Sequence, residues 1–289
     1  MQNYPILLDI HTHSIASGHG SRDTVTDMAR AAADRSLKVL GISDHGPKTP
    51  GAGSSSYFRS LCLAPRSRFG VSLLYGAELN ILNEKGDVDL EDSIIASLDY
   101  AFISMHHPVF QGRSTGSPKA PEGFGGAGTV SSRAGGACPT DSIAFRDSCT
   151  NAYINAMKHP CVRFIGHPDD GRFPVDYERL LSACAKYRIY PEINNASLMP
   201  DAYRTEGHKN SMEILSLCKK MRLPVLLSSY SHGREHIGDM ESVFPLLWEC
   251  DFPEELVING SVEFLMKLFG KGKYIVKQDI LIGKDVGLL

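Results

Sequence analysis

Short apolar, β-branched runs recur along the chain and alternate with longer stretches in which apolar residues return at helical spacing. The runs predict seven strands, at Ile6–Ile10, Lys38–Ser43, Val71–Glu78, Tyr100–Met105, Val162–Gly166, Arg188–Ile193 and Pro224–Ser229, with Val257-Ile258-Asn259 as a candidate eighth. Helices are predicted at Thr24–Ser36, with Asp23 as its N-cap, and at Ser142–Lys158, Asp176–Tyr187, Lys209–Met221, Met240–Cys250 and Ser261–Phe269. Strands that alternate with helices indicate βαβ units and a mostly parallel sheet.

One stretch, Gln111–Cys138, breaks this pattern. It contains eight glycines and four serines among 28 residues, and Phe124 is its only aromatic residue. Such a segment buries too little apolar area to offset its ordering entropy, so a disordered insertion is favoured over a functional lid. We therefore predict one barrel domain over residues 1–270, carrying this insertion at about 111–138, and a C-terminal tail over 271–289.

Composition narrows the possible partners. The 289 residues include 30 basic and 33 acidic side chains, a balance that gives no electrostatic footprint for nucleic acid but does not exclude a small anionic substrate. No apolar run approaches the ~18 residues of a membrane span, and the N-terminus lacks the basic region of a signal peptide. Seven scattered cysteines without a CxxC pair favour a reducing, cytoplasmic location.

The histidines carry the functional signal. Seven of the eleven fall at the ends of predicted strands or in the loops that follow, namely His11, His13, His19, His45, His106, His167 and His232. The two-residue spacing of His11 and His13 places both rings on one face of a strand. Glu78 ends the third predicted strand. Because the carboxyl ends of barrel strands ring one opening, we expect these side chains to meet in space.

The ligand types narrow the choice of metal. Imidazole combined with carboxylate suits Zn²⁺, Mn²⁺ or Fe²⁺, whereas Mg²⁺ and Ca²⁺ prefer oxygen ligands. Seven imidazoles and Glu78 exceed the needs of one ion and suit two or three. A bridging carboxylate such as Glu78 can hold two ions about 3.5–4 Å apart, the spacing used for in-line displacement at phosphorus.

As a set, these motifs resemble the PHP (polymerase and histidinol phosphatase) family, most closely its YcdX-type phosphatases. The matching stretches are Asp9-Ile-His11-Thr-His13, the His19 loop, Ser43-Asp44-His45-Gly46, Gly76-Ala77-Glu78-Leu79-Asn80, His106-His107-Pro108-Val109-Phe110, Gly166-His167-Pro168, Glu192-Ile193-Asn194-Asn195 and Ser231-His232. The resemblance implies an α/β fold, a distorted TIM-like (β/α)7 barrel with mostly parallel strands. It also implies three metal ions, usually zinc.

The resemblance further implies a ligand set for each ion. The first ion is expected on His11, His13 and Glu78, the second on Glu78, His106 and His167, and the third on His19, His45 and His232. The family expects one more ligand, an aspartate, where this chain has Tyr230. Three outcomes stay open. The first ion survives with an extra water, Tyr230 ligates as a phenolate because a cation lowers the phenol pKa below its usual ~10, or the ion and the activity are lost.

Four polar residues beside these motifs are expected to support the ligands by hydrogen bonds from behind. They are Asp9, Asp44, Glu192 and Asn194. The alternative for each is a purely structural role in a buried polar network.

The leading functional hypothesis is hydrolysis of small-molecule phosphomonoesters by metal-activated water. Clustered cations lower the pKa of a bound water toward ~7 and stabilise the departing oxygen. Its main alternative, motivated by Tyr230, is a catalytically impaired protein that binds metal or a phospho-ligand. An amidohydrolase is disfavoured because Tyr100–His106 contains no lysine to bridge two metals, and an exonuclease because no basic groove is evident. The sequence predicts neither the physiological substrate nor the oligomeric state.

Overall fold

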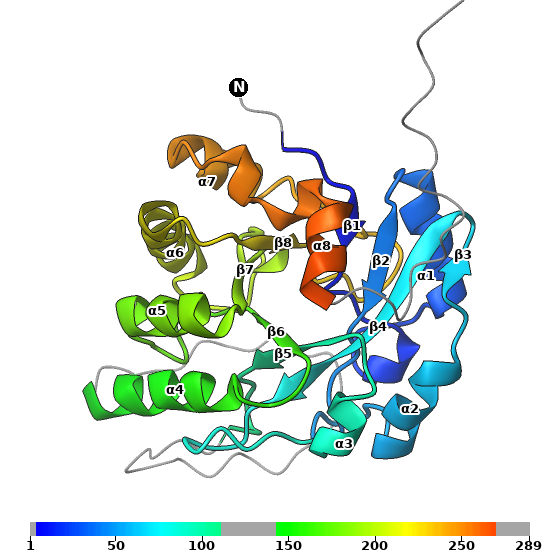
Figure 1. Cartoon of the computed structure of the whole chain (residues 1–289), viewed down its shortest axis with the longest axis horizontal. Coiled ribbons are helices and arrows are strands. Elements are labelled where there is room, and N and C mark those ends of the chain that lie inside the picture. Colours follow the sequence, from blue (N-terminus) through cyan, green and yellow to red (C-terminus); the bar gives the residue numbers. More distant parts are fainter. Residues whose placement is uncertain (1–3, 111–142, 270–289) are drawn as a thin grey trace, which may run out of the picture.

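The computed structural model describes residues 4–110 and 143–269. The predicted insertion at 111–138 and tail at 271–289 lie outside these residues. Seven parallel strands form a nearly closed barrel with interleaved helices (Figure 1), which confirms the predicted fold class. Their order round the barrel is β1 (Leu8–Asp9), β2 (Val39–Ile42), β4 (Val71–Asn80), β5 (Tyr100–Ser104), β6 (Val162–Ile165), β7 (Tyr190–Asn194) and β8 (Leu226–Ser228).

The first and last strands are joined by a bridge and by buried side chains, among them Asn259. Thr12 and Ser231 form a parallel bridge, and the His13 N–H donates to the Ser231 carbonyl over 2.8 Å. Asn259 is fully buried, and its Nδ2 donates to the Leu8 and Leu227 carbonyls over 2.9 and 2.8 Å. This amide therefore takes the place of ladder hydrogen bonds between β1 and β8.

The candidate eighth strand at Val257–Asn259 is wrong. Only Val257 makes a bridge, to Val225, and a 3-10 turn over Ile258–Gly260 follows it. The turn is what points the Asn259 amide at the gap between β1 and β8. A short strand that the sequence did not predict, β3 (Ser67–Arg68), pairs antiparallel with β4.

Eight helices are described. They are α1 (Val25–Asp34), α2 (Ser55–Ser60), α3 (Asp92–Ile95), α4 (Ile143–Ala156), α5 (Tyr177–Tyr187), α6 (Gly207–Met221), α7 (Phe244–Glu249) and α8 (Val262–Phe269). Six of them correspond to predicted helices, although α7 begins four residues after the predicted Met240. The short α2 and α3 were not predicted. In Figure 1, α4 to α7 stack along one side of the barrel, and α1 and α2 lie on the other.

The N-cap of α1 is Thr24 and not Asp23, which corrects the prediction. Thr24 Oγ1 accepts from the Asp27 N–H, and the Asp27 carboxylate accepts from the Thr24 N–H, so the two residues form a capping box. Asp23 accepts instead from the Arg234 N–H over 2.9 Å.

The barrel interior has an apolar end and a polar end. At the amino ends of the strands α8 covers the apolar end, where Phe269 stacks on Tyr100 of β5 and Phe264 meets Tyr190 of β7. Fully buried polar side chains gather at the carboxyl ends. Because burying unpaired polar groups costs free energy, this polar end marks the functional site.

Candidate metal centre

Glu78, at the carboxyl end of β4, is the centre of the polar cluster and is fully buried. Ring nitrogens of five histidines, from the ends of four strands, surround its carboxylate. Its Oε1 lies 2.9 Å from His167 Nε2, 3.4 Å from His106 Nε2 and 3.4 Å from His11 Nε2, and its Oε2 lies 2.7 Å from His45 Nδ1 and 3.6 Å from His13 Nε2. The structure thus brings together side chains that lie up to 156 residues apart, from His11 to His167.

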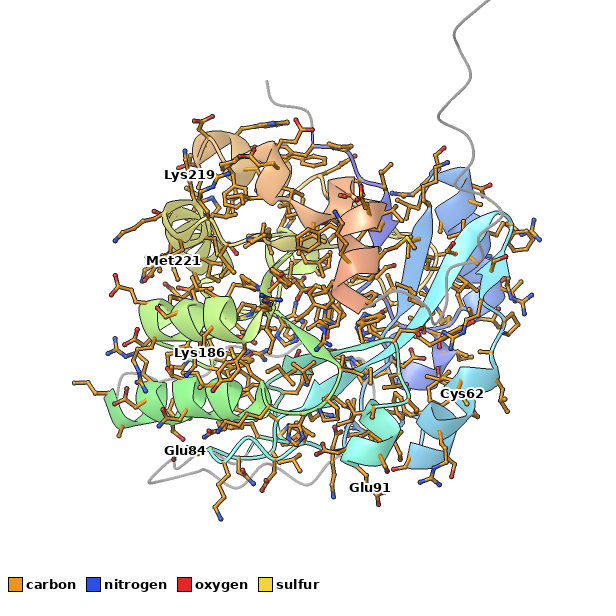
Figure 2. All side chains as sticks on the ribbon, in the orientation of Figure 1. Cys62, Glu84, Glu91, Lys186, Lys219 and Met221 are labelled. Atoms are coloured by element: carbon orange, nitrogen blue, oxygen red, sulfur yellow. The ribbon has the colours of Figure 1, made fainter. Side chains whose placement is uncertain are left out.

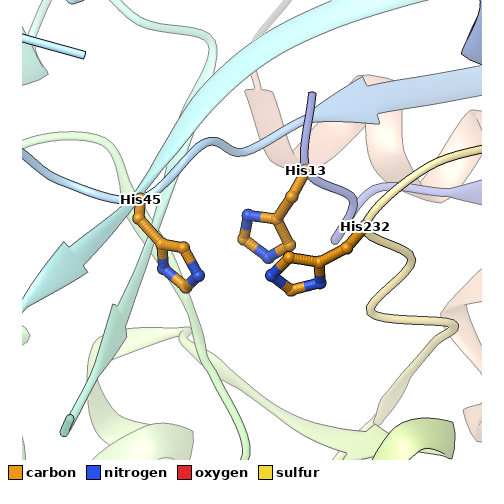
Figure 3. Close-up of side chains that lie close together, drawn as sticks. All are labelled: His13, His45 and His232. Carbon is orange, nitrogen blue, oxygen red and sulfur yellow. The ribbon is translucent and has the colours of Figure 1, made fainter. Parts of the chain in front are cut away.

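Three groups of ligand atoms lie close enough to hold an ion, each within 4.8 Å. They are His11, His13 and Glu78; His45, Glu78 and His106; and His13, His45 and His232. Figure 3 shows the rings of the third group turned toward one another. The first group coincides with the ligand set that the resemblance implies for one ion.

Two expected ligands, His167 and His19, belong to none of these three groups. His167 Nε2 nevertheless lies 3.2 Å from His106 Nε2, beside Glu78. His19 is exposed, and its ring centroid lies 4.7 Å from that of His45 and 5.3 Å from that of His232. His19 therefore lies at the outer rim of the cluster.

The donor set fits a transition-metal ion. In the described part of the chain, several buried atoms that face the centre have no hydrogen-bond partner: Nε2 of His11, His13, His45 and His232, and Oε2 of Glu78. Each unpartnered buried polar atom costs about 1–3 kcal/mol. A cation shared by imidazole nitrogens and a carboxylate removes this cost, and such a donor set suits Zn²⁺.

Glu192, on β7, supports two of the histidines from behind. Its Oε1 lies 2.6 Å from His11 Nδ1, and its Oε2 accepts from the His167 backbone N–H over 2.6 Å. Asn194 Nδ2 and the Ser228 hydroxyl donate to the same carboxylate. Because a carboxylate only accepts, His11 carries a proton on Nδ1 and turns Nε2 toward Glu78.

Two further histidines have their ring protons fixed by neighbours that the sequence did not single out. Asn80 Oδ1 lies 2.7 Å from His106 Nδ1 and can only accept, so the His106 proton is on Nδ1. Ser17 donates its hydroxyl proton to Asp44 over 2.8 Å, which leaves Ser17 Oγ to accept from His13 Nδ1 at 3.0 Å. Both rings therefore present a free Nε2 to the centre.

Asp9 lies in a different network from the other three predicted supporting residues. Its carboxylate accepts from the Ser229 hydroxyl and from the Gly238 N–H, the latter over 2.8 Å. These contacts hold the chain after β8, which carries Tyr230 and His232, and they do not reach an imidazole. The expected bond from Asp9 to a ligand ring is thus replaced by support of a ligand-bearing loop.

The buried charges of His11 and Glu192 are coupled. Burial lowers the pKa of His11, but the negative charges of Glu192 and Glu78 outweigh it and raise the pKa to about 9. Burial raises the pKa of Glu192, but the His11 charge and hydrogen bond outweigh it and lower the pKa to about 2. Without metal, His11 is therefore a cation at neutral pH.

Four other imidazoles at the centre, those of His13, His45, His167 and His232, are neutral at pH 7. Burial lowers the pKa of His13, and the charges of His45 and His232 lower it further. Burial also lowers the pKa of His45, that of His167 to about 4 and that of His232 to about 3. Each of these four neutral rings keeps one nitrogen lone pair that can bind a cation.

Tyr230 occupies the position of the expected aspartate and is 6% exposed. Its backbone is in the left-handed region, with φ 55°, and its ring lies edge-on to His11 and His13, at centroid distances of 4.9 and 4.8 Å. The Arg204 guanidinium carbon lies 4.4 Å from its ring centroid. Burial, then the charge of Glu78, raises the pKa of Tyr230 well above 10, so the hydroxyl is protonated in the metal-free protein.

Arg204 and Asp169 are buried beside the centre, and sequence reasoning missed both. Arg204 Nη1 donates to Ser197 Oγ over 3.2 Å, while its Nε and Nη2 have no hydrogen bond within the described residues. Burial raises the pKa of Asp169 to about 7. Its neighbour Asp170 is buried as well. A charged residue in a loop gives no sequence signal for burial.

Comparisons with known proteins agree with this geometry. No protein-family model matches the chain. A "probable phosphatase" of Clostridium novyi is 33% identical over 268 residues, which cover 92% of this chain and 96% of that protein. Another, of Caldanaerobacter subterraneus, is 34% identical over 258 residues and covers 89% of each chain. The structure of histidinol phosphate phosphatase from Lactococcus lactis, complexed with zinc, L-histidinol and phosphate, matches with a TM-score of 0.54 at 14% identity, covering 85% of this chain and 94% of that one.

The fold and the site together define an α/β-barrel phosphatase with buried His/Glu metal-binding clusters at the carboxyl ends of its strands. The chain belongs to the PHP family and, within it, to the YcdX-like phosphatases. Within the described residues, none of the helices has the length and apolarity needed to cross a membrane.

Proposed function

We propose that this phosphatase hydrolyses small-molecule phosphomonoesters with two or three zinc ions at the Glu78 cluster. One ion is assigned to His11, His13 and Glu78, a second to Glu78, His106 and His167, and a third to His19, His45 and His232. The observation that carries the proposal is the convergence of unpartnered imidazole nitrogens on one buried carboxylate. When bound, zinc supplies a Lewis acid that activates water and offsets phosphate charge.

The residues of the chain prepare the site for this chemistry. Glu192, Asn80 and Ser17 hold ring protons on Nδ1, so that Nε2 faces the centre without reorganisation. Glu78 carries negative charge at the middle of the cluster, where burial alone raises its pKa but the charges of His45 and His106 lower it well below its ordinary value. The cluster is therefore preorganised for cations.

We further propose that Tyr230 is a wall of the site and not a ligand. Its ring stands edge-on to two ligand rings, and Arg204 lies over it, which holds it in that position. The His11, His13 and Glu78 ion is then held by these three residues alone, with water to complete its coordination. Manganese or iron is the alternative metal, since the same donors suit both.

One specific observation favours the second function, a metal or phospho-ligand binding protein with impaired turnover. Tyr230 replaces an anionic side chain with a protonated phenol beside His11 and His13. The loss of this negative charge lowers the affinity of the site for the ion that His11 and His13 hold.

The experiment that tests the proposal is elemental analysis of the purified protein combined with hydrolysis of 4-nitrophenyl phosphate. Two or more equivalents of zinc, manganese or iron with turnover support the enzyme. Bound metal with no turnover of any phosphomonoester supports the binding protein. In His13→Ala, metal content and turnover are expected to fall together, and full retention of both removes His13 from the site.

A further inference from the structure

A pocket of about 640 Å³ opens over the histidine cluster. Its floor includes His45, His106 and His232, so a phosphate bound at the metal centre leaves the alcohol part of an ester in this pocket. The volume is that of a typical small-molecule site. The chemistry of the pocket wall therefore bears on which alcohol the enzyme accepts.

The apolar part of the wall above the histidines comes from three loops. These loops follow β2, β5 and β7, the second, fourth and sixth strands of the seven round the barrel. They contribute Pro50, Pro108, Val109, Ala196, Met199 and Tyr203. Because the three strands alternate round the ring, apolar groups face the pocket from three sides.

Charge is scarce in the same wall. Apart from the histidines, Arg172 is the one formally charged residue among the described residues that line the pocket, and none of them is Asp or Glu. The Arg172 guanidinium is already occupied, since its Nε donates to the Asp170 carboxylate over 2.9 and 3.1 Å. An ammonium group on a substrate finds no carboxylate in this lining, and a second phosphate finds only an arginine that is already paired with Asp170.

We propose that the substrate is the phosphate monoester of a neutral, largely apolar alcohol, an inference that rests on the proposed function. Apolar atoms of the alcohol replace water against Met199, Tyr203 and the prolines, and this burial supplies the binding free energy. A polyol or amino alcohol loses more hydration in this pocket than it regains from the polar side chains among the lining residues, which costs affinity. The pocket thus favours esters of apolar alcohols over esters of polar ones, because polar alcohols lose more hydration when they bind.

The first test compares three esters of primary alcohols with the metal-loaded enzyme: hexyl phosphate, glycerol 1-phosphate and histidinol phosphate. We expect kcat/KM for hexyl phosphate to exceed each of the others by roughly tenfold or more. Equal values, or a preference for either polar ester, overturn the inference and leave the proposed function standing.

Variants then locate the preference. Met199→Ser and Tyr203→Ser are each expected to raise KM for hexyl phosphate several-fold with little change in kcat. Tyr203 is 60% exposed, so its truncation does not threaten folding. The matched control is Met221→Ser, a partly buried methionine at the end of α6 and the periphery of the molecule (Figure 2), which is expected to leave KM unchanged. If neither pocket variant moves KM, the wall does not select the substrate.

A binding measurement separates this inference from the proposed function. If none of the esters is hydrolysed, the proposed phosphatase activity fails, and calorimetry with hexylphosphonate and 2,3-dihydroxypropylphosphonate decides the inference alone. Roughly tenfold tighter binding of hexylphosphonate, lost in Met199→Ser, supports an apolar-alcohol site. Equal binding of the two phosphonates overturns it.

Discussion

Glu192 Oε1 lies 2.6 Å from His11 Nδ1, and both side chains are fully buried. The pair is ionised in the metal-free protein, because its members have pKa values of about 2 and about 9. His11 also lies 3.4 Å from Glu78 through its other nitrogen, Nε2. The protein therefore holds a proton at the atom that is assigned to a metal ion.

The first prediction concerns this proton. An ion that binds His11 Nε2 must displace this proton, so zinc binding at pH 7 is expected to release about one proton from His11. The affinity for that ion is expected to fall about tenfold for each pH unit below 9. Calorimetry in two buffers of different ionisation enthalpy measures the release. In Glu192→Gln the charge that sustains the proton is absent, so the release is expected to fall toward zero. Unchanged release in that variant contradicts the coupling.

The same pair sets the pH dependence of stability without metal. The raised pKa of His11 contributes stability that is complete below its unfolded value of ~6.5 and is lost as pH rises through 9. The lowered pKa of Glu192 contributes stability that is present above ~4.3 and is lost as pH falls through 2. The stabilisation by the pair is thus greatest between about pH 4.3 and 6.5. Urea unfolding across pH is expected to show this maximum flattened in Glu192→Gln, and an identical profile for both proteins refutes it.

A second metal prediction isolates the role of Asn80. Asn80→Ala removes the acceptor at 2.7 Å that keeps the His106 proton on Nδ1, so zinc affinity is expected to fall roughly 10- to 100-fold. Asn83→Ala, which removes an exposed amide bonded to Asp87, is the control and is expected to bind zinc normally. Competition with a chromogenic chelator measures both. Equal affinities of the two variants show that Asn80 does not orient the ring.

The metal content of Tyr230 variants shows whether this side chain is a wall of the site or a metal ligand. If Tyr230 is a wall, Tyr230→Phe retains the zinc content of the natural protein, and Tyr230→Asp increases zinc content or affinity because it adds a carboxylate beside His11 and His13. Elemental analysis after dialysis distinguishes these outcomes. Loss of an equivalent of zinc in Tyr230→Phe shows instead that the phenol oxygen is a ligand.

The role of Asn259 in closing the barrel leads to a prediction about the free energy of unfolding. Asn259→Leu keeps the side-chain volume but removes the amide that joins β1 to β8, leaving the Leu8 and Leu227 carbonyls and the Leu227 N–H unpaired. At about 1–3 kcal/mol for each buried group, the free energy of unfolding is expected to fall by at least about 3 kcal/mol. Urea denaturation measures the change. The comparison is the partly buried Asn155→Leu, which removes a bond to the Glu84 carbonyl and an exposed bond from Lys158 Nζ. A loss smaller than that of Asn155→Leu contradicts this account of closure.

The strands and the histidine cluster were predictable because they depend on local pattern and on one property of barrels. Apolar runs locate the strands, and residues that end parallel strands meet at one rim, so His11, His45 and Glu78 could be placed together without coordinates. The N-cap error was avoidable, since Thr24 and Asp27 have the spacing of a capping box.

The rest depends on tertiary contacts that leave no periodic trace. Asn80 and Ser17 act through single hydrogen bonds to His106 and His13. Asn259 reaches across from a turn 251 residues after Leu8. Arg204 is a loop residue whose burial depends on how the segment after β7 folds over the cluster. Sequence pattern specifies which groups reach the rim, but not which neighbours fix their protons.

The most direct test of the central claim is a crystal structure of the zinc-loaded protein with anomalous scattering at the zinc edge. The account predicts at least two peaks around the Glu78 carboxylate, one of them about 2.0–2.1 Å from Nε2 of both His11 and His13. Zinc bound elsewhere, or no peak within coordinating distance of Glu78, contradicts it.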